Sequence, residues 1–242
     1  MEGVGMDACA RKLREETDCL DCAEDKPSSR LNNNNNNNNN CLTDIDYSLC
    51  SELVALSRIL TPVVDYISDD VDMFPLEVLS SLHLPLSAPK LPADLIVRPL
   101  RSTDYNHGYL QLLSQLTSVG DVSEEQFHKR FLSMQKTNPK SYYVVVLEEI
   151  SSGMLVGSAT LVIEWKFIHE AGCRGRTEDV VVDRRMRGKQ LGKLLNFYLV
   201  ELARLIGVYK MSLECKDSLI PFYEQFGFKL DQGNNFLVQR FD

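Results

Sequence analysis

The sequence predicts an α/β protein in which helices flank both faces of a mixed central β-sheet. From residue 95 onward, the hydrophobic periods indicate the element order β-α-α-β-β-β-α-β-α-β. Within this part, the β-branched run 180–182 is followed by a basic loop with two glycines and by an amphipathic helix that begins at Leu191. An acidic, asparagine-rich segment precedes these elements, which predicts a disordered N-terminal extension.

The N-terminal part of the chain lacks the apolar content that a folded core needs. Residues 1–90 hold 7 Lys and Arg against 16 Asp and Glu, and residues 32–40 are all asparagine. We expect a disordered tail over 1–41, an amphipathic helix (42–68) and linker over 42–71, and one folded domain over 72–242. We interpret Cys19 and Cys22 as reduced thiols, because no second pair of metal ligands follows them.

Charge and hydropathy argue against several classes of function. The net charge of −8 comes from the N-terminal part, since residues 91–242 carry 19 basic and 18 acidic side chains. Such an acidic tail argues against nucleic acid as a partner. No apolar run approaches the roughly 20 residues that span a bilayer, and the first ten residues do not resemble a secretory signal. We therefore expect a cytoplasmic protein with no transmembrane segment.

The periodic part divides into six expected strands and four expected helices. The strands are expected at 95–98, 142–147, 154–164, 180–182, 209–215 and 236–241. Helices are expected over 104–116, after the capping box Ser123-Glu124-Glu125-Gln126, from Leu191 onward, and over 221–226. Four prolines between residues 73 and 93 indicate an extended arm before the first strand.

The loop before Leu191 predicts a phosphate site. A strand, a glycine turn and a helix N-terminus together present free backbone N–H groups to an anion, and Arg187, Lys189 and Lys193 add positive charge. A Walker loop is excluded, because three residues rather than four separate Gly188 from Gly192 and no Ser or Thr follows Lys193. The dinucleotide-binding pattern of glycines is also absent. The alternative is an ordinary turn with solvated charges.

The same loop carries a family resemblance. Its segment Arg187-Gly188-Lys189-Gln190-Leu191-Gly192 resembles the acetyl-CoA loop Arg/Gln-x-x-Gly-x-Gly/Ala of the GNAT acetyltransferases, with Gln190 where that superfamily usually has glycine. The expected element order is also that of the GNAT fold. Five further stretches are similar to the eukaryotic glucosamine-6-phosphate N-acetyltransferases. These stretches are residues 164–169, 174–179, 209–215, 222–228 and 239–241. The resemblance covers about 72–242.

The resemblance implies a reaction and an assembly. The reaction is transfer of acetyl from acetyl-CoA to the 2-amino group of glucosamine 6-phosphate, in UDP-N-acetylglucosamine biosynthesis. It implies direct attack through a tetrahedral intermediate, with no metal. It also implies a homodimer in which both subunits build the sugar pocket. Two alternatives stay open: a GNAT-type enzyme acting on protein or other small amines, and a non-catalytic CoA-binding scaffold.

The resemblance assigns catalytic roles to four residues. Tyr223 is expected to protonate the departing thiolate, since a phenol is not ionised at pH 7; the alternative is an aromatic that fills the core. Glu178 and Asp179 are expected to hold the substrate amine, and strand alternation predicts that only one of them faces it. At Glu214 the expected contact to the amine is the backbone carbonyl. The oxyanion donor is expected to be a backbone N–H of the 180–182 strand.

Binding roles are implied for the remaining matched positions. Those for acetyl-CoA are Val180, Val181, Val182, Arg187, Gly188, Lys189, Gln190, Leu191, Gly192, Lys193 and Tyr223. Those for the sugar phosphate are Ser102, Lys166, Arg176, Thr177, Glu178, Asp179, Tyr209, Lys210 and Arg240, among which Lys166, Arg176 and Arg240 are expected to bind the phosphate. We leave His169 out of catalysis. Leu219 stands where the family commonly has an asparagine that contacts CoA.

Overall fold

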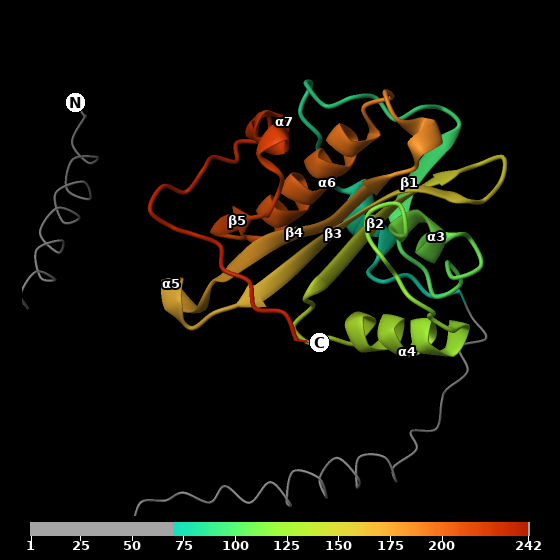
Figure 1. The fold of residues 1–242 in the computed structure, drawn as a ribbon, viewed down its shortest axis with the longest axis horizontal. Helices are drawn as coiled ribbons and strands as arrows, with labels where there is room; N and C mark the ends of the chain where they lie inside the picture. The colour runs from blue at the N-terminus through green and yellow to red at the C-terminus, as the bar shows by residue number, and fades with distance from the viewer. Residues whose placement is uncertain (1–69, 242) are drawn as a thin grey trace, which may run out of the picture. The chain divides into compact units, whose positions relative to one another are not determined.

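One five-stranded sheet organises the chain, and its strands neighbour one another in sequence order, as Figure 1 shows. This computed structural model describes residues 70–241, which belong to one structural unit. The tail predicted over 1–41 and most of the helix and linker predicted over 42–71 lie outside the described residues. No helix among the described residues is long and apolar enough to cross a membrane.

The strands form a mixed sheet, as predicted. Its members are β1 (Leu95–Pro99), β2 (Tyr142–Glu149), β3 (Leu155–Trp165), β4 (Cys173–Val182) and β5 (Lys210–Ser212). The first four pair antiparallel to their neighbours, whereas β5 runs parallel to β4. The strand β2, which lies between β1 and β3, is almost entirely buried between Val144 and Leu147, which explains its continuous run of apolar residues.

Helices cover both faces of the sheet. They are α2 (Leu76–Ser80), α3 (Tyr109–Leu113), α4 (Glu124–Gln135), α5 (Ile168–Ala171), α6 (Leu191–Ile206) and α7 (Ile220–Glu224), with short 3₁₀ turns at Arg184–Met186 and Asp217–Leu219. Two consecutive residues of β3 contact helices on opposite faces of the sheet. Gly157 packs against Leu195 of α6, whereas Ser158 contacts Tyr109 of α3. The predicted α/β class with helices on both faces is therefore confirmed.

Two helices follow from their sequence signals. The predicted capping box opens α4, where Gln126 N donates to Ser123 Oγ at 3.2 Å and Ser123 N donates to Gln126 Oε1 at 2.8 Å. Helix α6 ends at Gly207, whose left-handed backbone suits a glycine. The apolar face of α6 enters the core as predicted, except for Leu205, which is exposed in the last turn.

The first predicted helix and the predicted arm differ from the structure. Only Tyr109–Leu113 of the range 104–116 is helical, because Gly108 before it has a left-handed backbone and Asp104 is held in a buried ion network. The arm over 73–93 contains the short helix α2 and is anchored by buried Met73, whose N–H donates to Leu100 O at 2.7 Å.

The last predicted strand is absent from the described residues. The range 236–241 has no regular structure, and its apolar side chains Phe236, Leu237, Val238 and Phe241 are exposed. β1 and β5 are the edge strands of the sheet, and the segment 236–241 pairs with neither of them. The strand predicted over 209–215 is also shorter, because only Lys210–Ser212 pairs with β4.

A buried ion network holds the turn between β1 and α3. Both nitrogens at the end of the Arg98 side chain bind the Asp104 carboxylate, at 2.9 and 2.7 Å, and Arg98 Nε contacts Glu148 Oε2 at 2.5 Å. Arg98 is 3% exposed and Asp104 is fully buried. The backbone N–H of Arg101 also donates to Asp104, at 2.7 Å. This network fixes the loop that carries Ser102.

We predict that Asp104→Asn destabilises the protein by about 3 kcal/mol, as expected when one partner of a buried pair is removed. The variant leaves the buried Arg98 guanidinium with a single carboxylate, that of Glu148. Urea unfolding of the variant and the wild type measures the difference. Asp121→Asn, at an exposed position, is the control and should change stability by less than about 0.5 kcal/mol. Equal effects of the two substitutions would contradict this view of the network.

Candidate functional site

A β-bulge interrupts β4 next to the two predicted acids. Ser158 of β3 pairs with Val181, but Thr160 pairs with Glu178, so that Asp179 and Val180 together stand opposite Ala159. Asp179 has a φ of 50°, a left-handed conformation that Asp tolerates better than most residues. The extra residue breaks the alternation of side chains between the two faces of the strand.

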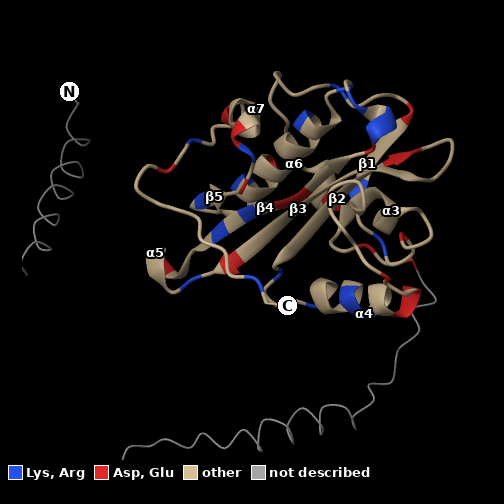
Figure 2. Cartoon of the chain, viewed as in Figure 1, with Lys and Arg blue, Asp and Glu red and all other residues tan. Residues whose placement is uncertain are grey.

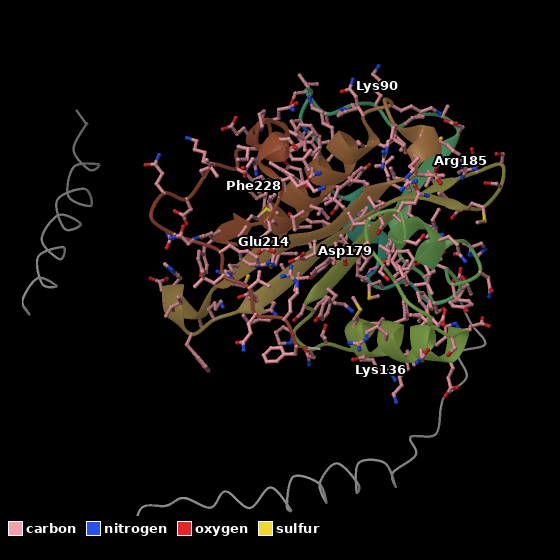
Figure 3. All side chains as sticks on the ribbon, in the orientation of Figure 1. Lys90, Lys136, Asp179, Arg185, Glu214 and Phe228 are labelled. Atoms are coloured by element: carbon pink, nitrogen blue, oxygen red, sulfur yellow. The ribbon has the colours of Figure 1, made fainter. Side chains whose placement is uncertain are left out.

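Glu178 and Asp179, the residues at this bulge, both line one cavity. This acceptor cavity has a volume of about 700 Å³ and is lined by α3, α4 and strands β2 to β4, including Glu178 and Asp179. Both residues line this cavity, and the expectation that only one of the two acids faces the amine stays a prediction. Figure 3 labels Asp179 near the centre of the view; the residue is exposed at the surface, and its carboxyl is partly shielded by its neighbours.

The electrostatics of the acceptor cavity disfavour charge on Asp179. Burial raises the pKa of the Asp179 carboxyl, and the neighbouring charge of Glu178 raises it further. Tyr109 of α3 is 8% exposed, and burial likewise raises the pKa of its phenol well above the ordinary value. A carboxyl beside a neutral phenol offers hydrogen-bond partners for an amine.

On the other side of β4, the sheet opens. The parallel pairing of β4 with β5 begins at Arg174 and Lys210 and ends at Arg176 and Ser212, although β4 continues to Val182. A second cavity of about 640 Å³, the thioester cavity, lies beyond this point. Its lining includes Leu213, Glu214, Cys215, Tyr223, Phe228 and Phe236.

Tyr223 lies in the thioester cavity with its phenol protonated. The residue belongs to α7, and its ring centroid lies 5.0 Å from that of Phe222 and 6.2 Å from that of Phe228. Burial raises the pKa of Tyr223 above its ordinary value. The hydroxyl is therefore a proton donor at neutral pH. Aromatic neighbours hold the ring in place, and the side chain is only partly buried.

The loop before α6 presents its backbone as predicted. Gly188 has a φ of 83°, which favours glycine. Gln190 also has a left-handed backbone, with a φ of 59°, and this explains why glycine is usual at its position. Gln190 caps α6 without a side-chain hydrogen bond, so no side chain occupies the first N–H groups of this helix. Figure 2 shows Lys and Arg along the segment that leads into α6.

Asp183 anchors that loop to the rest of the domain. Its carboxylate accepts from Arg185 N at 2.8 Å, from Arg185 Nε at 3.0 Å and from Gln115 Nε2 at 3.3 Å. Gln115 Oε1 in turn accepts from Arg184 N at 2.9 Å. The hydrogen bond from Arg185 lowers the pKa of Asp183 to about 2. The sequence analysis did not identify Gln115, since nothing in its neighbourhood distinguishes it from a solvated helix residue.

The three basic residues predicted for phosphate differ in their surroundings. Lys166 Nζ lies 2.6 Å from Glu164 Oε2, and the guanidinium of Arg176 binds the carboxylates of both Glu178 and Glu214. Arg240 is exposed and forms no ion pair with any residue in the described range. Of the three, Arg240 alone has its whole guanidinium open to a ligand.

The remaining predicted substrate residues are spread over the sheet edge and its loops. Ser102 is 1% exposed, and its hydroxyl accepts from Val71 N at 3.0 Å. Thr177 is buried on β4, and Lys210 Nζ lies 3.2 Å from Asp231 Oδ2. The ring of Tyr209 lies 4.1 Å from that of His169. The structure therefore brings only some of these groups to an open cavity.

Two basic residues at the acceptor cavity were missed by the sequence analysis. Lys129 and Arg130 of α4 belong to its lining, and neither forms an ion pair with another described residue. Their neighbours Phe127 and Phe131 were predicted to face the core, and the two cations between them had no distinguishing signal. No group of three His, Cys, Asp or Glu within residues 70–241 is arranged to hold a metal ion.

The sequence matches a family of known proteins and several named relatives. A model described as "Acetyltransferase (GNAT) family" matches residues 107–228. A Drosophila melanogaster protein, "Probable glucosamine 6-phosphate N-acetyltransferase", is 52% identical over 147 residues, which cover 60% of this chain and 66% of that protein. The Arabidopsis thaliana "Glucosamine 6-phosphate N-acetyltransferase" is 38% identical over 131 residues, which cover 54% of this chain and 87% of that protein.

Solved structures agree with the sequence matches. The crystal structure of glucosamine-6-phosphate N-acetyltransferase from Arabidopsis thaliana aligns with a TM-score of 0.57 and 35% identity, over 61% of this chain and 99% of that chain. An acetyltransferase of Trypanosoma brucei aligns with a TM-score of 0.54 and 34% identity, over 60% of this chain and all of that chain. The family match over residues 107–228 includes the elements from α3 to α7.

We predict that Asp183→Asn lowers stability at pH 7 by about 1.5 kcal/mol, the low end for hydrogen bonds to a charged group, because Arg185 is exposed. The folded pKa of about 2 lies below the ordinary 3.8, so this stabilisation is present above pH 3.8 and is lost as the pH falls through about 2. Denaturant unfolding at several pH values should show the two proteins converging toward pH 2. The exposed Asp94→Asn is the control, and a pH-independent difference would contradict the assignment.

Proposed function

The chain belongs to the GNAT family of acetyltransferases, and we propose that it transfers acetyl from acetyl-CoA to the 2-amino group of glucosamine 6-phosphate. The observation that carries this proposal is the pair of acids at the β4 bulge, which line one cavity while Tyr223 lines another. The named activities of the Drosophila and Arabidopsis relatives support the substrate. By this proposal the protein acts in the cytoplasm, in UDP-N-acetylglucosamine biosynthesis.

The reaction divides between the two sides of β4. The amine nitrogen attacks the thioester carbon, the tetrahedral intermediate collapses, and the carbon–sulfur bond breaks. Asp179 and Glu178 hold and orient the amine from the acceptor cavity, and the backbone carbonyl of Glu214 contributes to its binding. Tyr223 donates its proton to the departing thiolate, and a backbone N–H of the Val180–Val182 segment stabilises the oxyanion. The proton lost by the amine passes to the carboxylates or to water.

The cofactor occupies the opening between β4 and β5. Its pyrophosphate binds the loop Arg187–Lys193 at the N-terminus of α6, where backbone N–H groups are free and three side chains are cationic. Its pantetheine arm follows the edge of β4 along Val180, Val181 and Val182, which β5 leaves unpaired. This path brings the thioester to Tyr223.

The sugar phosphate binds between the acids and a cationic surface. The predicted set is Ser102, Lys166, Arg176, Thr177, Tyr209, Lys210 and Arg240. Arg240 is the strongest candidate for the phosphate, because its guanidinium has no ion-pair partner among residues 70–241. Lys129 and Arg130 add positive charge to the rim of the acceptor cavity. We assign catalysis to the domain over 72–242.

A homodimer is part of this proposal. Exposed apolar side chains gather at the turn between β3 and β4, at Trp165, Phe167 and Ile168, and along the C-terminal segment at Phe236 and Leu237. Surface of this kind supports contact with a second copy of the chain. Sedimentation analysis should give a dimer; a monomer at micromolar concentration would contradict it.

The function is tested by the release of CoA thiol with different acceptors. Glucosamine 6-phosphate should be acetylated with a kcat/KM at least a hundredfold above that for glucosamine, since a phosphate bound by arginine contributes about 3 kcal/mol. Peptide amines should react no faster than the background. A preference for a peptide amine would overturn the proposal in favour of a protein acetyltransferase.

We predict that Tyr223→Phe lowers kcat by about a hundredfold, within the range for loss of a general acid. Binding of acetyl-CoA, measured by calorimetry, should be nearly unchanged, because the aromatic packing against Phe222 and Phe228 is kept. Tyr143→Phe, on β2 and outside both cavities, is the matched control. A normal kcat in the Tyr223 variant would remove Tyr223 as the acid.

We predict that Arg240→Ala raises the KM for glucosamine 6-phosphate about tenfold or more, as expected when a charged hydrogen bond to the phosphate is lost. The KM for acetyl-CoA and for unphosphorylated glucosamine should stay within twofold, and these two values are the control. Initial-rate kinetics on both sugars provides the comparison. An equal rise in KM for glucosamine would rule out contact with the phosphate.

A further inference from the structure

We propose that Arg176 is a positioning residue, which ties Glu178 to the edge strand beside the acceptor cavity and does not bind the phosphate of the substrate. The inference rests on the proposed function and assigns a different task to one of its residues. Arg176 occupies the last position at which β4 and β5 are paired, opposite Ser212. Any link at this point sets where the two strands begin to separate.

The Arg176 side chain makes that link by itself. Its Nε donates to Glu178 on β4, and its Nη2 donates to Glu214, two residues beyond the end of β5. A guanidinium is planar and presents donors in fixed directions, so it can hold two carboxylates at a defined separation. Glu178 lines the acceptor cavity and Glu214 lines the thioester cavity. The link therefore joins the walls of the two cavities.

The local charge argues against a phosphate at Arg176. One guanidinium faces two carboxylates, and the carboxyl of Asp179 lies next to Glu178. This cluster carries a net negative charge when its acids are ionised, which repels a phosphate and attracts an ammonium group. Two of the three guanidinium nitrogens, Nε and Nη2, are already engaged. The substrate amine, and not its phosphate, suits this place.

The groups that face the acids determine what removal of Arg176 would do. Glu178 and Asp179 come from β4, Glu214 from the chain after β5, Tyr109 from α3, and Lys129 and Arg130 from α4. Arg176 is the cation that is hydrogen-bonded to Glu178. Without it, Glu178 and Glu214 lose their bound countercharge, and the uncompensated charge of Glu178 raises the pKa of the neighbouring Asp179 carboxyl further.

The same guanidinium also contacts the C-terminal segment. Its carbon Cζ lies 5.9 Å from the ring centroid of Phe236, a cation–π contact. Phe236 lies four residues before Arg240, the phosphate candidate. In this way Arg176 connects the amine end of the site with the segment that carries Arg240, without touching the phosphate. The side chains of Arg176, Glu178 and Glu214 are 25%, 38% and 36% exposed, so we expect an effect on activity rather than on stability.

The kinetic test compares Arg176→Gln with the wild type on phosphorylated and unphosphorylated glucosamine across pH. We expect kcat/KM to fall at least tenfold by the same factor for both sugars, and the acidic limb of the pH profile to move upward by about one pH unit. Arg174→Gln is the matched control, because Arg174 pairs with Glu164 on the same sheet and is 31% exposed. A loss confined to the phosphorylated sugar would overturn the proposal.

A second measurement does not depend on turnover. Carbon-13 NMR titration of the side-chain carboxyls in wild type and Arg176→Gln should show the pKa of Asp179 raised further in the variant. If the wild type fails to acetylate glucosamine 6-phosphate, the proposed function fails, and this titration still decides the role of Arg176. Unchanged titration of Asp179 in the variant would overturn the inference.

Discussion

The separation of β4 from β5 is the constraint on which the rest of the site depends. Parallel pairing stops at Arg176 and Ser212, and the remaining part of β4 has no strand on that side. Backbone N–H and C=O groups that lose a strand partner must be satisfied by water or by a ligand. A cofactor with amide groups can take that position, and its thioester then lies between the two cavities.

The bulge at Asp179 determines how β4 carries the two acids, Glu178 and Asp179. An uninterrupted strand would turn Glu178 and Asp179 to opposite faces, and only one of them could meet the amine. Asp179 has a left-handed backbone and lines one cavity together with Glu178, where burial and the charge of Glu178 raise the pKa of Asp179. In the proposed reaction, β4 orients the amine on one side and exposes its edge to the cofactor on the other.

Local signals were sufficient for much of the fold. The capping box at Ser123, the apolar spacing of α6 and the glycine loop at 188–192 each predicted the structure that is observed, because their information lies within a few residues. The early end of β5 and the irregular C-terminal segment could not be predicted in this way. Whether a segment such as 236–241 forms a strand depends on an available edge, which is a property of the whole assembly.

The candidate site shows the same division. Tyr223 and the Arg187–Lys193 loop are recognisable from their sequence motifs. The bulge at Asp179 is not, since its neighbours Val180 to Val182 give an ordinary strand pattern. Lys129, Arg130 and Gln115 reach the site only through the packing of α3 and α4 on the sheet. The engagement of Arg176 by two carboxylates likewise depends on the position of Glu214, 38 residues away in sequence.

The most direct test of this account is a crystal structure of the protein with CoA and N-acetylglucosamine 6-phosphate bound together. The account predicts that the CoA sulfur lies between β4 and the residues after Ser212, within roughly 3.5 Å of the Tyr223 hydroxyl. It also predicts that the sugar nitrogen lies within hydrogen-bonding distance of Asp179 or Glu178. A sulfur bound outside this opening, or a sugar nitrogen remote from both acids, would contradict it.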